Sequence, residues 1–97
     1  MVTFEDFRGS LAGAKPAASL SVPLQALWWA GKDDWDTAHK LVMDESSADA
    51  AWVHAYLHRV EGDLPNARYW YAQAGKPLTT KAFKDEWAEM AAMLLRG

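Results

Sequence analysis

Residues 50–77, AAWVHAYLHRVEGDLPNARYWYAQAGKP, decide the fold of this chain. Apolar residues recur at helical spacing on both sides of Gly62-Asp63, and Gly75 to Pro77 ends the second run. A glycine directly after such a run is typical of a helix C-terminus, and an aspartate is typical of the N-cap of the next helix. The stretch therefore predicts two helices that fold back on each other as a hairpin.

Similar signals predict four further helices and no strand. The last helix is the clearest, and we expect it to begin at Thr79 or Thr80. Its apolar side chains repeat at i, i+4, i+7 and i+11, the spacing of one helix face: Phe83, Trp87, Met90 and Leu94. With the hairpin included, the expected helices cover about residues 4–12, 23–31, 33–43, 47–61, 64–74 and 80–96.

The chain also repeats itself weakly at a shift of 29 residues, which aligns residues 34–38 (DWDTA) with residues 63–67 (DLPNA). This repeat predicts that the second and third helices form one hairpin and the fourth and fifth a second. The sixth helix is then expected to cover the exposed end of the stack, as terminal elements of repeat arrays do. The expected fold is therefore all-α, with about six helices arranged as stacked antiparallel hairpins.

Residues 61–77, EGDLPNARYWYAQAGKP, resemble the second half of a tetratricopeptide-type (TPR) repeat. After a Gly-Asp turn they carry a small residue, an aromatic residue, a second small residue and a proline: Ala67, Tyr71, Ala74 and Pro77. The resemblance implies TPR-like hairpins, whose first helices can line a concave, ligand-facing groove. The string AWVHAYLHR…EGD…NARYWY…AG, followed by a last helix containing Glu-Trp, is also similar to a small family of uncharacterised bacterial proteins. That similarity covers roughly residues 20–97 and implies no known activity.

A chain of 97 residues has room for one domain. We expect it to cover residues 1–97, with an N-terminal helix and linker over residues 1–19 and a helical-hairpin core over residues 20–97. A net charge of −3 without a basic stripe makes nucleic acid an unlikely partner class. The chain lacks cysteine and any apolar run near the ~20 residues of a membrane span, and Glu5 and Asp6 lie where a signal peptide would be basic. These features predict a cytoplasmic protein without membrane association.

His54 and His58 are the only pair that suggests metal binding or catalysis. They lie one helical turn apart, Glu61 shares their face, and such an i, i+4 pair can supply two metal ligands. His39 could add a third, although nothing in the sequence places it nearby. The HExxH signature of metalloproteases is absent. The simpler hypothesis is that both imidazoles pack between helices, so we expect no metal and no cofactor.

The aromatic residues support two interpretations. Some lie on inward faces and are expected in the core: Trp35, Trp70, Tyr71 and Trp87. Trp52 and Tyr56 share one side of the fourth helix with Arg59, and a surface of these residue types is typical of binding hot spots. Packing of both rings in the core is an equally good alternative. Trp29 lies opposite the main apolar face of its helix, so it is expected to be exposed.

These patterns favour a non-enzymatic interaction module. It would bind a peptide or protein partner in an aromatic groove formed by Trp52, Tyr56 and Arg59, with Trp29 as a further contact. A first alternative is a small metal-dependent or acid–base enzyme centred on His54, His58 and Glu61. A second is a structural subunit that self-associates as a homo-oligomer through an aromatic surface such as that around Trp29.

Overall fold

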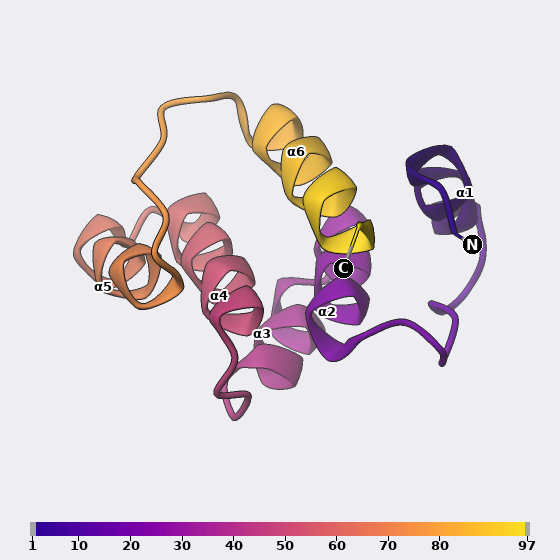
Figure 1. The fold of residues 1–97 in the computed structure, drawn as a ribbon, viewed down its shortest axis with the longest axis horizontal. Helices are drawn as coiled ribbons and strands as arrows, with labels where there is room; N and C mark the ends of the chain where they lie inside the picture. The colour runs from indigo at the N-terminus through magenta and orange to yellow at the C-terminus, as the bar shows by residue number, and fades with distance from the viewer. Residues whose placement is uncertain (1, 97) are drawn as a thin grey trace.

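The computed structural model describes residues 2–96, which form six α-helices and a short 3-10 helix and contain no strand (Figure 1). This confirms the all-α prediction. In chain order the elements are α1 (Phe4–Gly9), η1 (Ser10–Ala12), α2 (Val22–Gly31), α3 (Trp35–Val42), α4 (Ala48–Glu61), α5 (Leu64–Ala74) and α6 (Phe83–Leu95). The most extensive helix contacts join α2 to α3 and α4 to α5, so the chain forms the two expected hairpins.

The turn residues of the second hairpin act as the sequence indicates. The Ser47 hydroxyl accepts a hydrogen bond from the backbone N–H of Ala50 and begins α4. Gly62 ends α4 in the left-handed region, with φ of 89°, which a residue without a side chain adopts at little cost. Asp63 then caps α5, and Gly75 ends α5 with φ of 71°. These groups satisfy backbone atoms that helix ends leave unpaired, so the hairpin is locally determined.

The start of α6 differs from the prediction of Thr79 or Thr80, because the helix begins at Phe83. The Thr79 hydroxyl accepts a hydrogen bond from the N–H of Lys81 and so forms a turn instead of a helix cap. The Arg59 guanidinium donates to the carbonyl of Lys81. Residues 79–82 are therefore held outside the helix by a side chain from α4.

The position of α6 also corrects the expectation that the last helix covers the end of the stack. Figure 1 shows α6 alongside α2 and α4, the first helices of the two hairpins, and its main contacts are with α1, α2 and α4. The Trp87 indole N–H donates to the carbonyl of Leu27 in α2 at 2.7 Å. In a TPR-like arrangement this face of the first helices would be the concave groove. Here the chain's own last helix occupies it.

The N-terminal segment completes the core on the far side of α6. Phe7 is buried and stacks on Trp87, with 5.6 Å between ring centroids. The Trp28 indole N–H donates to the Ser10 hydroxyl at 2.9 Å, and Trp28 is fully buried. The N-terminal segment therefore supplies cover that the two hairpins alone lack.

Trp35 and Trp70, which were expected in the core, are only partly buried.

None of the helices in residues 2–96 has the length and apolar character needed to cross a lipid bilayer.

Candidate functional site

All three histidines of the chain meet where α3 packs against α4. The Nε2 atoms of His39 and His54 lie 3.0 Å apart, and one ring nitrogen from each histidine lies within 4.8 Å of the others. His54 and His58 are one turn apart on α4, as their spacing predicts. His39 comes from α3, and its approach depends on the packing of the hairpins, which the sequence spacing does not reveal. We call these three residues the histidine cluster.

Two tryptophans stack on members of the histidine cluster. Trp35 stacks on His39 with ring centroids 4.7 Å apart and planes 10° apart. Trp70, from α5, stacks on His54 with centroids 4.1 Å apart and planes 17° apart. The Trp35 indole N–H donates to the carbonyl of Leu57 at 2.7 Å, which fixes that ring on α4. The imidazoles are therefore held in place by three helices.

Burial lowers the pKa of two members of the histidine cluster, His39 and His54. His54 and His58 are 5% and 6% exposed, and His39 is partly buried. Burial and the neighbouring His39 and His58 lower the pKa of His54 to about 4. Burial also lowers the pKa of His39. Within residues 2–96, His54 Nδ1 is the single buried side-chain nitrogen or oxygen that lacks a hydrogen-bond partner.

A carboxylate borders the histidine cluster on the solvent side. Glu61 Oε1 lies 2.5 Å from His58 Nδ1, and the Glu61 side chain is 39% exposed. Asp63 places a second carboxylate oxygen within 4.8 Å of ligand atoms of His58 and Glu61. Glu61 therefore lies on the same face of α4 as His54 and His58, as its position three residues after His58 predicts. Its contact orients the His58 ring and leaves Nε2 of that ring free of the carboxylate.

This geometry does not favour the acid–base enzyme alternative. A general base has to reach a substrate proton directly or through one water molecule. His54 is covered by Trp70, and both His54 and His58 are more than nine-tenths buried. None of the surface hollows described below is lined by a histidine. A bulky substrate therefore has no direct access to the rings of His54 and His58.

The expected open groove of Trp52, Tyr56 and Arg59 is filled by α6. Trp52 and Tyr56 are 5% and 6% exposed, so packing in the core, the alternative interpretation, describes both rings. Arg59 Nη1 lies 2.8 Å from Glu86 Oε1, and Glu86 is a buried residue of α6. A buried carboxylate requires such partners, and this pairing brings α6 onto α4.

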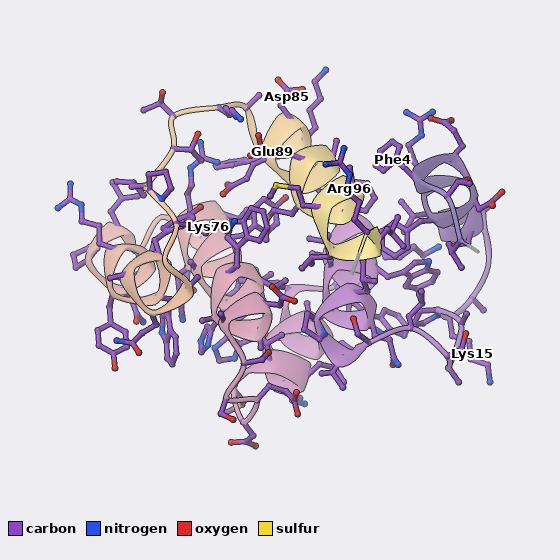
Figure 2. The ribbon with its side chains drawn as sticks, viewed as in Figure 1. Phe4, Lys15, Lys76, Asp85, Glu89 and Arg96 are labelled. Atoms are coloured by element: carbon purple, nitrogen blue, oxygen red, sulfur yellow. The ribbon has the colours of Figure 1, made fainter. Side chains whose placement is uncertain are left out.

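Two hollows lie where α6 approaches α4. The first, of about 300 Å³, lies between Trp52, the loop before α6 and α6 itself. Lys76, at the start of this loop, extends toward α4, and its Nζ lies 4.4 Å from the centroid of the Trp52 ring (Figure 2). The ammonium group therefore lies over the Trp52 ring, while Leu78 and Met93, which are 39% and 42% exposed, supply the apolar surface of this hollow.

The second hollow lies between the α2–α3 turn, α4 and the start of α6, and we call it the Phe83 groove. One part, of about 200 Å³, is lined by Ala30, Asp33, Trp35, Tyr56, Leu57, Val60 and Phe83. An adjoining part, of about 360 Å³, shares Ala30, Asp33, Tyr56 and Phe83 and continues to Arg8, Leu11, Gly31, Lys84 and Trp87. The shared residues make the two parts one continuous surface.

Phe83 and Val60 are the exposed apolar side chains of this groove, with 47% and 38% of their surface accessible. The Arg59 guanidinium lies 4.8 Å from the centroid of the Phe83 ring, an arrangement typical of cation–π contacts. Burial raises the pKa of Tyr56 to about 12, so its hydroxyl remains a donor at neutral pH. Phe83 was expected on the inward stripe of α6, but the first turn of α6 extends beyond the core and leaves its ring exposed.

Trp29 is partly buried and not fully exposed as expected. Its ring lies edge-on to Trp28, 5.0 Å between centroids, and it borders an open hollow with Pro16, Ala17 and Ala18 of the N-terminal linker. The linker therefore lies beside the surface that was expected to support self-association.

No protein-family model, curated protein or solved structure matches the chain. Its function therefore has to be inferred from the geometry of the histidine cluster and the Phe83 groove.

Proposed function

We propose that the chain is a non-enzymatic helical-hairpin module that binds a peptide segment of a protein partner in the Phe83 groove. One observation carries the proposal: an aromatic ring that is 47% exposed stands over a hollow with apolar walls. Ligand sites are typically concave and mostly apolar with a few polar groups, and interface hot spots are enriched in aromatic residues and arginine. Phe83, Tyr56 and Arg59 supply these features.

The walls of the groove indicate what kind of segment fits. Ala30, Leu57 and Val60 form an apolar wall that suits an aliphatic or aromatic side chain. Lys84 and Arg8, which is paired with Glu5 at 2.8 Å, border the end near Trp87, whereas Asp33 lines both parts of the groove. A carboxylate of the bound segment would therefore find favourable charge at the Lys84 end. The preferred segment has an apolar anchor and an acidic residue near it.

Selection from a library of random peptides, followed by affinity measurement by fluorescence anisotropy, tests this proposal. We expect the selected peptides to share the apolar anchor and the acidic residue, and Phe83→Ala to weaken their binding by roughly 1–3 kcal/mol. Tyr69→Ala is the matched control, because Tyr69 is an aromatic residue of α5 that is 56% exposed and lies outside the groove. Equal binding by both variants would contradict the proposal.

A second copy of the chain is the other candidate occupant, since exposed apolar surface often marks a contact between subunits. Sedimentation at micromolar concentration separates the two cases. A dimer that dissociates on Phe83→Ala would replace the peptide hypothesis with the structural-subunit hypothesis.

A further inference from the structure

We propose that His39, His54 and His58 bind one divalent first-row transition metal ion, for which Zn²⁺ is the best candidate. The site uses other ligand atoms than the Phe83 groove, although Trp35 borders both, and it would give the chain a second ligand. Three imidazoles without cysteine form a donor set that suits Zn²⁺ and its neighbours in the first row. All the histidines of the chain take part, although they come from two helices and are separated by as many as 19 positions.

The distances suit a single ion. With Zn–N bonds of about 2.0–2.1 Å, two tetrahedral ligand nitrogens lie about 3.3 Å apart. The Nε2 atoms of His39 and His54 are 3.0 Å apart, close to this value. The third nitrogen, from His58, completes a set that lies within 4.8 Å. Small rotations of the His58 side chain would bring all three to bonding distance.

The surroundings of the histidine cluster are those of a metal site. Histidines that bind metals usually place their second ring nitrogen against a carboxylate or carbonyl, and His58 Nδ1 lies 2.5 Å from Glu61 Oε1. Trp35 and Trp70 stack on His39 and His54 and limit the movement of both rings. The cluster is therefore preorganised, and ligation would require little loss of side-chain freedom.

Purely structural packing explains the histidine cluster less well. Burying imidazoles in place of apolar side chains is unfavourable unless every nitrogen is paired. His54 Nδ1 is buried without a partner, and His39 and His54 can share only one proton in their mutual contact. A bound ion would replace this one shared hydrogen bond with a bond to each of the two Nε2 atoms, and His54 Nδ1 would stay without a partner.

Three protein ligands leave one coordination position of a tetrahedral ion for a water molecule or an external donor. His39 is partly exposed and the Glu61 side chain is 39% exposed, so solvent reaches this side of the cluster. The ion would also link α3 to α4 and so stabilise the contact between the two hairpins. Metal binding is therefore expected to raise the melting temperature.

The test uses the full chain after treatment with a chelator and dialysis. Titration calorimetry with Zn²⁺ should give one equivalent bound, and excess Zn²⁺ should raise the melting temperature by several degrees. His39→Gln should weaken binding by more than about tenfold and remove most of this rise. Lys40→Gln is the control, because Lys40 is the exposed neighbour of His39 on α3 and should behave as the original chain does.

Co²⁺ provides a second measurement that needs no variant. Binding to the cluster should give the intense visible absorption of tetrahedral Co²⁺, which Zn²⁺ then displaces. The weak absorption of hydrated octahedral Co²⁺ would overturn the proposal. So would a Zn²⁺ affinity that His39→Gln and Lys40→Gln leave equally unchanged.

Discussion

Glu86 shows at the residue scale how one buried charge fixes the position of a helix. It is 1% exposed, and its two carboxylate oxygens contact Arg59 Nη1 at 2.8 Å and the Tyr71 hydroxyl at 2.5 Å. Burial and the hydrogen bond to Glu86 raise the pKa of Tyr71, so the phenol stays a donor. These contacts join α6 to both helices of the second hairpin.

Replacing Arg59 should therefore be costly. Arg59→Met leaves the Glu86 charge buried without its cation, which typically costs 3–5 kcal/mol of unfolding free energy. The matched surface pair is Lys81–Glu89, whose side chains are 49% and 45% exposed, so Lys81→Met should cost at most about 1 kcal/mol. Urea unfolding measures the loss of unfolding free energy in each variant. Similar losses for the two variants would show that Glu86 is not buried as described.

The low pKa of His54 predicts a pH-dependent stability in the metal-free protein. The unfolded chain binds the proton near the ordinary pKa of 6.5, whereas the folded chain binds it near about 4. The unfolded state therefore holds more protons between these values, and the unfolding free energy falls as pH decreases from 7 to 4. The groups that face His54 are His39 from α3 and His58 from its own helix, and Glu61 borders the cluster.

His54 should account for a decrease in the unfolding free energy on the order of 2 kcal/mol between pH 7 and pH 4.5. Urea unfolding at several pH values, with a chelator present, measures it. His54→Phe retains an aromatic ring against Trp70 and removes the titrating group. We expect this variant to show a shallower pH dependence, and an unchanged slope would contradict the burial of a neutral His54.

At the element scale, local signals determined which segments become helices but not where each helix packs. Ser47, Gly62, Asp63 and Gly75 act within a few residues of their own position, so the second hairpin could be predicted closely. The periodicity of α6 showed an apolar face without indicating its partner. Glu86 resembles a surface residue in the sequence, and its pairing with Arg59 spans 27 positions. Contacts of this range carry no local sequence signal.

Local sequence signals also did not predict which helices come together at the candidate sites. The i, i+4 spacing was enough to place His54, His58 and Glu61 on one face, because they share a helix. His39 could be placed beside them only through the packing of α3 on α4. The Phe83 groove was missed because the apolar periodicity of α6 gave Phe83 an inward position, whereas α6 begins at Phe83 and its first turn extends beyond the core. Its first turn then contributes an exposed ring to the surface.

Gly31 lies where α2 and α6 approach each other closely. A Cβ atom at this position would lie 2.9 Å from Trp87 Cζ2 and 3.2 Å from the methyl groups of Leu11. Trp87 cannot move freely, since its indole N–H is bonded to the Leu27 carbonyl and its ring stacks on Phe7. Gly31→Ala should therefore lower the unfolding free energy by about 1–3 kcal/mol.

Gly9→Ala is the matched control for Gly31→Ala. No atom lies within 4 Å of a Cβ at Gly9, and its backbone is helical, with φ of −61° and ψ of −31°. Alanine should be neutral there or stabilise by up to about 1 kcal/mol. Thermal unfolding distinguishes the two outcomes. Equal effects at both glycines would contradict the contact between α2 and α6.

At the scale of the whole molecule, α6 changes what a pair of helical hairpins can bind. It occupies the face of α2 and α4 where a TPR-like module would hold its ligand, and α1 covers α6 in turn. The Phe7 ring of α1 stacks on the Trp87 ring of α6 and connects the first and last helices within one core. The proposed binding surface, the Phe83 groove, therefore lies at the edge of this face.

The most direct test of this account is a map of backbone amide shifts in the ¹⁵N-labelled protein as a selected peptide is added. We predict that the perturbed amides gather around the groove, at residues 30–33, 56–60 and 83–84. The amides around Trp52, Lys76 and Met93, which line the other hollow, should change little. Perturbations centred on this second group, or displacement of α6 from α2 and α4, would contradict the account.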